Sequence, residues 1–384
     1  MATGFPTKAN WVSGDILTAA QMDDLAGTVN ALSNASATSG SVLVSNVAGT
    51  SFAYQPLQAA GKNAVINGGM DIWQRGTSVA IAASTSYTAG FSADRWDTGT
   101  GANQAITISR QVTGDTTNLP NIQYAMRYQR NSGQTGVGGL SLANSFESSN
   151  SIPFAGKTVT LSYYARAGAN YSSASSALGA ALYSGTGTDQ NRLAGAYTGD
   201  ATPISSNITL TTTWQRFTVT GTVASTATEL SIIFSWTPSG TAGANDYFEI
   251  TGVQLELGSV ATTFSRAGGT LQGELAACQR YYWRATSGVN FTQHAFGIAS
   301  STTNINVTVP LPVTMRTAAT SVDFANITAA DGVSSPVIST LVTGNGSGGN
   351  LQNLTLTSTG LTQFRYYVVQ NSSAAGYLGL NAEL

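Results

Sequence analysis

The feature that most constrains the fold is a strict alternation of apolar and polar residues. In the segment TVTLSY (158–163), valine, leucine and tyrosine alternate with threonine and serine. This is the period of two expected of a half-buried β-strand. Comparable runs are QYAMRYQR, WQRFTVTG, ELSIIFSW and YFEITGVQLEL, and turn residues such as those at 185–187 and 238–240 separate them. Many short strands without alternating helices predict an antiparallel β-sandwich of the jelly-roll type, and we place it at 63–266.

A short amphipathic segment follows the predicted sandwich. Leu271, Leu275, Cys278 and Tyr282 are spaced by four, three and four residues, which is typical of one buried helix face. We therefore predict a connecting helix within 267–284. Cys278 lies on this apolar stripe, so we interpret it as a small buried hydrophobic residue rather than a reactive thiol.

Strand patterns return after the helix, as in VNFTQHAFGIAS, INVTVPLPV, LQNLTLTST and QFRYYVVQ. They predict a second, smaller β-sandwich over 285–384. The whole chain is thus predicted to be mainly β, with two sandwiches joined by one helix.

The beginning of the chain has a different pattern. Thr18-Ala-Ala-Gln21 fits a helix capping box, and the apolar residues after it follow a 3-4-3 spacing. The stripe consists of Met22, Leu25, Val29 and Leu32. We predict a helical attachment segment at 1–35 and a linker or extended arm at 36–62. Two alternatives stay open for the helix: it docks on its own chain, or it bundles with copies of itself or with a neighbouring protein.

Charged residues make up only 9% of the 384-residue chain, and the formal net charge is −2. Lysine occurs only at Lys8, Lys62 and Lys157, and the arginines are dispersed. Nucleic-acid binding needs clustered basic residues, so we expect no nucleic-acid partner. No apolar run approaches the roughly 18 residues of a membrane helix, so we expect no membrane insertion. The first residues lack the apolar core of a signal peptide, which predicts assembly in the cytoplasm.

The residues that usually carry catalysis are scarce. His294 is the only histidine and Cys278 the only cysteine, so the sequence offers neither a nucleophilic dyad nor a zinc cluster. The remaining enzymatic option is a pair of carboxylates, either Asp94 with Asp97 or Glu249 with Glu256, and the sequence does not show whether either pair faces a cleft. We expect no catalytic residues, no metal site and no cofactor, and hence a protein that is not an enzyme.

Aromatic side chains are the candidate binding groups, because an exposed ring can stack on the apolar face of a sugar. In Tyr163-Tyr164 and Tyr366-Tyr367, neighbouring rings must point to opposite faces of a strand. The alternative for each single ring is a place in the hydrophobic core. The candidate glycan-binding residues are Trp73, Trp96, Tyr164, Trp236 and Tyr366.

Four motifs resemble bacteriophage tail-fibre and related virion proteins. They are NAVINGGMDIWQRGTS (63–78), FSADRWDTG (91–99), WQRFTVTGTV (214–223) and, as the most specific, GVQLELGSVATTFSRAGGTLQGELAACQRYYWR (252–284). The segment TKANWVSGDILTAAQMDDL (7–25) is similar to N-terminal segments that attach such proteins to a virion.

The resemblance implies a non-enzymatic structural protein on the virion surface, commonly a homotrimer. It implies attachment to other virion proteins, in the tail or the head, through residues 1–35 and contact with host cell-surface polysaccharide. A head-attached decoration fibre and a free carbohydrate-binding module are the alternatives. Related carbohydrate-binding modules often hold a structural calcium, for which Asp71 and Glu256 match best by position. The acidic pattern is incomplete, so we predict no metal.

Overall fold

The computed structural model describes residues 41–45, 52–56, 62–84, 88–101, 104–119, 121–286 and 288–384. The chain divides into two compact units, 1–59 and 60–384. In the first unit, strands β1 (Ser41–Ser45) and β2 (Phe52–Pro56) form an antiparallel pair in which Leu43 lies opposite Tyr54. The predicted N-terminal helix, with Met22, Leu25, Val29 and Leu32, lies outside the described residues.

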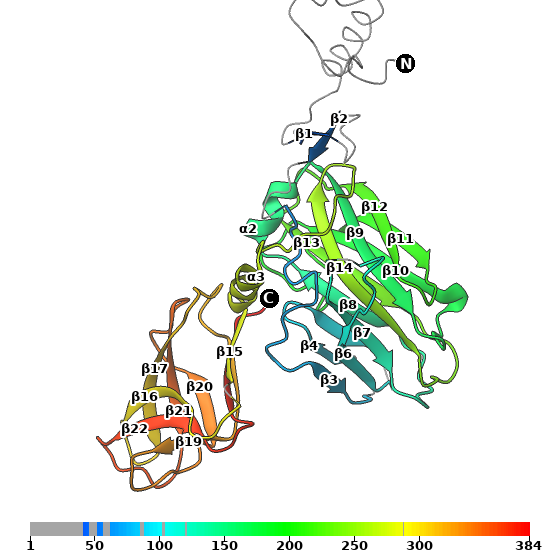
Figure 1. The fold of residues 1–384 in the computed structure, drawn as a ribbon. Helices are drawn as coiled ribbons and strands as arrows, with labels where there is room; N and C mark the ends of the chain where they lie inside the picture. The colour runs from blue at the N-terminus through cyan, green and yellow to red at the C-terminus, as the bar shows by residue number, and fades with distance from the viewer. Residues whose placement is uncertain are drawn as a thin grey trace, which may run out of the picture. The chain divides into compact units, whose positions relative to one another are not determined.

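The second unit begins with two antiparallel six-stranded sheets that form a sandwich (Figure 1). This confirms the predicted β-sandwich. The first sheet has the order β11-β10-β13-β8-β5-β4. Its strands are β4 (Thr88–Phe91), β5 (Asp97–Thr100), β8 (Leu140–Ser145), β10 (Ala177–Gly185), β11 (Ala201–Thr209) and β13 (Glu229–Trp236).

The second sheet has the order β12-β9-β14-β7-β6-β3. Its strands are β3 (Ser78–Ile81), β6 (Ile106–Val112), β7 (Tyr124–Arg130), β9 (Thr158–Ala167), β12 (Gln215–Thr222) and β14 (Tyr247–Leu257). Three short helical turns also belong to the sandwich: α2 (Ser148–Ser151), η1 (Ile152–Phe154) and η2 (Ala174–Ser176).

The core lies between the two sheets and follows from the alternation in the sequence. Alternate residues of β9, namely Val159, Leu161 and Tyr163, are fully buried. The ring of Tyr163 meets Phe234 of the opposite sheet edge-on, with centroids 4.8 Å apart. Each such side chain contributes about 1.5–3 kcal/mol through removal from water. Thr160 and Ser162 between them point to the other face of the sheet, where they are buried as well and bond to the Gly258 carbonyl and to Arg216.

Helix α3 (Leu271–Gln279) follows the sandwich, and Thr270 caps it by accepting a hydrogen bond from Gly273 N at 3.0 Å. The predicted apolar stripe is only partly correct. Cys278 is buried, but Leu271 is 49% exposed, and Tyr282 lies beyond the helix in a strand. The helix ends before Tyr282 because that residue begins the next strand and pairs with Asn381.

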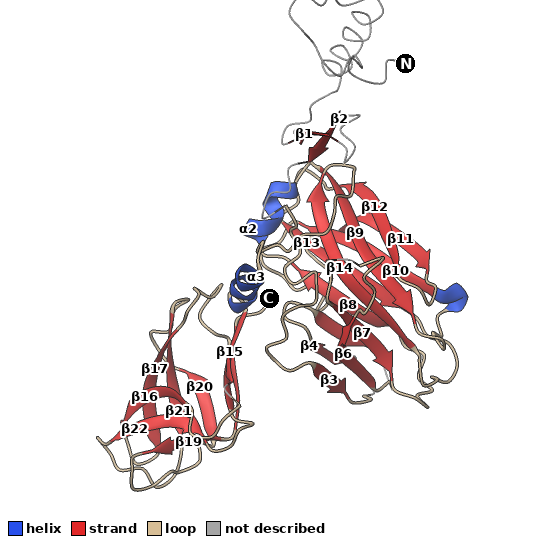
Figure 2. Ribbon diagram, viewed as in Figure 1, coloured by secondary structure: helices blue, strands red, loops and turns tan. Residues whose placement is uncertain are grey.

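The rest of the chain forms a smaller β region with a curled sheet (Figure 2). A three-stranded sheet, β15-β23-β18, contains β15 (Tyr282–Thr286), β18 (Ser321–Ala325) and β23 (Tyr377–Asn381). A six-stranded sheet has the order β19-β22-β16-β17-β21-β20. Its strands are β16 (Gln293–Ala299), β17 (Asn304–Pro310), β19 (Ile327–Ala330), β20 (Thr340–Thr343), β21 (Leu351–Thr357) and β22 (Tyr366–Asn371).

The smaller region has its own hydrophobic core, which includes Ile305, Leu356, Tyr367 and Leu380. Across the described part of the chain, none of the helices is both long and apolar enough to cross a membrane.

Candidate functional site

Three of the five candidate aromatic residues lie inside the sandwich. Trp96 is fully buried, Trp73 is 8% exposed and Trp236 is 3% exposed. Trp73 and Trp96 donate their indole N–H groups to the carbonyl oxygens of Met70 and Asn67, at 2.8 and 3.0 Å. The prediction that these three rings are available to a glycan is therefore corrected, because each ring belongs to the core or its margin.

Tyr164 lies on the outer face of the sheet, opposite in direction to the buried Tyr163, as the strand geometry requires. Its ring is half-buried against a small apolar cluster formed by Leu119, Ile122, Ala125 and Trp214. The Arg216 guanidinium lies 5.6 Å from the ring centre. A role of Tyr164 in glycan binding stays a prediction.

Tyr366 is the candidate that the fold leaves open to solvent. Its side chain is 75% exposed, whereas its neighbour Tyr367 is 1% exposed. Tyr366 lies opposite Ile298 of β16, and two residues further Val368 lies opposite Phe296. These four side chains share one face of the six-stranded sheet, and Phe296 is 63% exposed.

A pocket of about 360 Å³ opens on this face. We call it the Tyr366 pocket, and its lining residues are Phe296, Ala330, Asp331, Gly332, Tyr366, Tyr367, Val368 and Gln370. Two exposed rings thus border a cavity that also carries one amide side chain. Aromatic walls with a few polar groups are typical of sites for small ligands.

The negative charge at the Tyr366 pocket, that of Asp331, is balanced by neighbouring groups of the protein. The Asp331 carboxylate accepts hydrogen bonds from the backbone N–H groups of Ser334 at 2.7 Å and Val333 at 2.9 Å. It also pairs with the Arg365 guanidinium at 2.7 Å. These contacts, led by the Ser334 N–H, hold the pKa of Asp331 well below its usual range. The pocket therefore presents rings and an amide, and its one carboxylate already has partners.

Exposed apolar side chains concentrate in the smaller β region. Monomeric proteins rarely leave many large apolar groups together on the surface unless they bind something. Among the described residues, those exposed in this region are Val289, Phe291, Phe296, Ile298, Val333, Val337, Val342, Leu351, Phe364 and Tyr366. This distribution distinguishes the smaller β region from the sandwich, where fewer large apolar side chains are exposed.

The carboxylate pairs named from the sequence have structural partners. Asp94 accepts hydrogen bonds from Gln74, and Asp97 accepts one from Asn191 at 3.0 Å. Burial raises the pKa of Asp94 to about 6. Glu249 pairs with two arginines, and Glu256 accepts a hydrogen bond from Thr262 N at 2.8 Å. Neither pair lines the Tyr366 pocket.

The two positions considered for calcium are also held by separate groups. The Asp71 carboxylate pairs with Arg266 at 2.7 Å, and Glu256 bonds to Gln254 and Thr262. Within the described ranges, no group of three or more histidine, cysteine, aspartate or glutamate side chains converges as a metal site would require.

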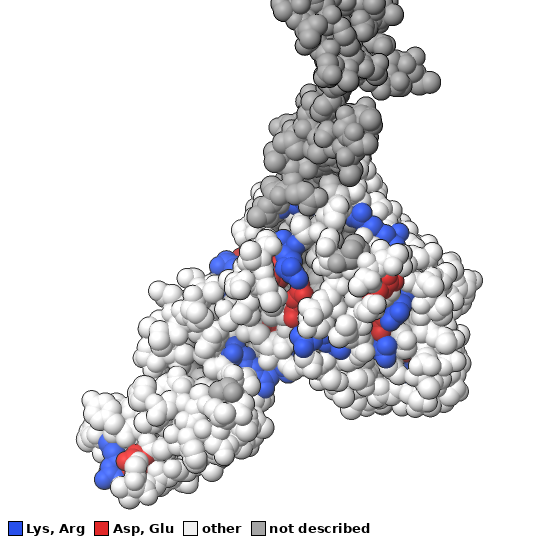
Figure 3. Space-filling view, in the orientation of Figure 1, with Lys and Arg blue, Asp and Glu red and all other residues white. Residues whose placement is uncertain are grey.

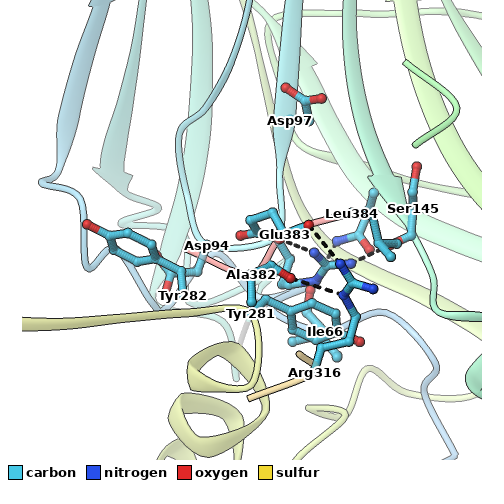
Figure 4. Close-up of polar contacts among 12 residues, drawn as sticks. Ile66, Asp94, Asp97, Ser145, Tyr281, Tyr282, Arg316, Ala382, Glu383 and Leu384 are labelled. Carbon is cyan, nitrogen blue, oxygen red and sulfur yellow. Dashed lines mark hydrogen bonds and ion pairs between the residues drawn. The ribbon is translucent and has the colours of Figure 1, made fainter. Parts of the chain in front are cut away.

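A buried polar cluster joins the sandwich to the end of the chain. Arg95 pairs with Glu383, and its guanidinium lies 3.5 Å from the ring centre of Tyr281. Arg316 donates to the carbonyl oxygens of Ala382 and Glu383, each at 3.0 Å (Figure 4). The sequence did not predict these contacts, because Arg95 and Glu383 are 288 residues apart, and Arg316 is 66 residues from Ala382.

Neither a protein-family model nor a curated protein sequence matches the chain. A carbohydrate-binding module of family CBM4 is similar in structure, with 15% identity and a TM-score of 0.29 over 50% of this chain and 99% of that one. A putative sugar-binding protein from Bacteroides thetaiotaomicron has 12% identity and a TM-score of 0.29, with 51% and 100% covered.

The enzymatically active domain of tailspike protein 4 from bacteriophage CBA120 is also similar, with 13% identity and a TM-score of 0.31. The similarity covers 53% of this chain and 22% of that one. At such identities and TM-scores the similarities are distant, and no conclusion about this chain follows from them.

Proposed function

We propose that this protein is a non-enzymatic virion fibre that binds glycans on a host surface through its smaller β region. Residues 1–35 would attach it to other virion proteins, and the particle would carry it as a homotrimer. The motif resemblance supports the virion assignment. The observation that carries glycan binding is the pair of exposed rings, Tyr366 and Phe296, beside a pocket of about 360 Å³.

The chemistry of the Tyr366 pocket favours an uncharged sugar ring. An exposed aromatic ring offers an apolar surface that matches the C–H face of a pyranose, and Gln370 supplies donor and acceptor groups for hydroxyls. The Asp331 carboxylate is already paired, so a ligand need not bring a positive charge. Several copies on one particle would raise the effective concentration and strengthen weak individual contacts.

The test is binding of the full-length protein to an array of neutral polysaccharides, with Tyr366→Ala as the variant. We expect the variant to lose at least about tenfold in affinity for the best ligand, because truncation of a central aromatic anchor typically costs this much. Phe291→Ala is the matched control. Phe291 is 65% exposed but does not line the pocket, and its N–H bonds to Asn371 at the opposite end of β22 from Tyr366.

Equal losses of affinity in the two variants would contradict the proposal, because they would show that binding does not depend on the ring at the Tyr366 pocket in particular. The absence of any bound polysaccharide would contradict it as well. Release of reducing sugars from the bound ligand would contradict the non-enzymatic part.

A further inference from the structure

A row of charged side chains crosses the outer face of the sheet that contains β14. Arg127 of β7, Glu249 of β14 and Arg166 of β9 lie directly opposite one another on three adjacent strands. Arg127 donates from Nε and Nη2 to Glu249 Oε1 at 2.8 and 2.6 Å, and Arg166 donates from Nε to Oε2 at 2.6 Å. We call these three residues the Arg–Glu–Arg row.

The row has more positive than negative charge facing the solvent. The Glu249 side chain has no exposed surface, whereas those of Arg127 and Arg166 are 25% and 28% exposed. Within the described part of the chain, the Nη groups of Arg166 make no hydrogen bond. Asp115 interacts electrostatically with Arg166 but forms no ion pair with it. Its carboxylate accepts hydrogen bonds within its own loop, from Thr117 and Asn118.

This arrangement is unusual for the molecule. Charged side chains are sparse on the face in Figure 3, where some groups contain basic residues alone and others contain basic and acidic residues together. Another carboxylate shared by two arginines is Glu383, which pairs with Arg75 and Arg95. Glu383 and Arg95 are buried at the junction, where Asp94 and Asp97 add negative charge. Among the residues that the structure describes, no such additional carboxylate pairs with the Arg–Glu–Arg row.

Aromatic rings hold both guanidinium groups in place. Arg127 lies 4.0 Å from the ring centre of Tyr247, and Arg166 lies 4.9 Å from that of Trp214. A fixed guanidinium plane fits an oxyanion with two parallel hydrogen bonds, and little side-chain entropy remains to be lost on binding.

The next row on the same face contains two polar side chains that already have partners in the fold: the Thr107 hydroxyl donates to Asn131 Oδ1 at 2.8 Å, and the Gln129 amide donates to the Ala244 carbonyl at 2.9 Å. Thr107, Gln129 and Tyr247 lie opposite one another on β6, β7 and β14. Tyr247 is half-buried, so part of its ring is open beside Arg127.

We propose that the Arg–Glu–Arg row binds the carboxylate of an acidic sugar, whose ring lies against Tyr247. This second site lies on the sandwich and takes a charged ligand, whereas the Tyr366 pocket takes a neutral one. It does not depend on the function of that pocket.

The test uses the full-length protein and polygalacturonate immobilised on a biosensor, with carboxyl-reduced polygalacturonate as the neutral counterpart. We expect binding to the acidic polymer alone. Arg166→Gln should weaken it by about tenfold, because a charge-assisted hydrogen bond is lost. Arg166→Lys should also weaken binding to the acidic polymer, since lysine keeps the positive charge but lacks the planar guanidinium with its paired donors. Glu249 stays paired with Arg127 in both variants, and thermal melts verify their folding.

Arg110→Gln is the matched control, because it removes the same charge from neighbouring β6 and should leave binding unchanged. Tyr366→Ala should also leave it unchanged, which separates this site from the proposed function. Four results would overturn the proposal: no binding to polygalacturonate, equal binding to the reduced polymer, equal losses for Arg166→Gln and Arg110→Gln, or full competition by acetate at the same carboxylate concentration.

Discussion

Asp94 shows how one buried residue couples the fold to pH. Its carboxyl group is fully buried, and burial raises its pKa from 3.8 to about 6, against the opposing influence of Arg75 and Gln74. The folded state therefore takes up a proton at a higher pH than the unfolded chain. The contribution of this group to the free energy of unfolding consequently rises as the pH falls through 6 toward 4.

Asp94→Asn tests this coupling, because the variant lacks the titrating group. Relative to the variant, the wild-type protein should gain about 2 kcal/mol of stability between pH 7 and pH 4.5. Urea unfolding of both proteins at the two pH values measures the difference. Parallel pH dependences would show that Asp94 titrates as an ordinary exposed carboxyl.

Single residues also show what alternation in the sequence does and does not predict. It predicted that Tyr163 and Tyr164, and likewise Tyr366 and Tyr367, point to opposite faces. The alternation did not predict which outer ring stays exposed. Tyr164 is half-buried against the apolar cluster around Trp214, whereas Tyr366 is 75% exposed. Trp96 and Trp236 were indistinguishable from surface rings in the sequence, since burial depends on the facing sheet.

At the scale of elements, helix α3 is held by a buried polar side chain that its sequence pattern did not predict. Its buried face includes Glu274, which accepts hydrogen bonds from the backbone N–H groups of Asn67 and Gly268. An apolar stripe alone could not reveal this polar anchor, because one partner, Asn67, lies in a loop 207 residues away in the sequence. The segment before the helix also approaches it closely at Gly268 and Gly273.

Gly273→Ala should destabilise the protein although alanine favours helices. A Cβ atom on Gly273 would lie 2.1 Å from the carbonyl oxygen of Gly268, so one backbone must move. We expect a loss of about 1–3 kcal/mol, typical of overpacking. Gly195→Ala is the control, because its Cβ would meet no atom within 4 Å. Thermal unfolding compares the two variants, and equal stabilities would refute the close contact.

The N-terminal segment is the element that the proposed fibre needs for attachment. Replacement of both Leu25 and Val29 by aspartate places charge on the predicted stripe. We expect loss of trimer formation or of particle attachment, while the β regions stay folded. Mass photometry, particle co-sedimentation and near-ultraviolet circular dichroism measure the three properties. Unchanged assembly and incorporation would show that the stripe has no such role.

At the scale of the whole molecule, the order of two β regions joined by one helix was predictable, because periodicity is a local property. The buried junction was not, since Arg95 and Glu383 are 288 residues apart in the sequence and only the tertiary fold pairs them. The Arg–Glu–Arg row was also invisible in the sequence. Arg127, Arg166 and Glu249 belong to separate strands, and only the register brings them together.

The most direct test of glycan binding is a crystal structure of the full-length protein with the best ligand from the neutral polysaccharide array. We predict a sugar ring stacked on Tyr366 and bordered by Phe296, with a hydroxyl bonded to Gln370. A neutral ligand bound only elsewhere, with the Tyr366 pocket free, would contradict it.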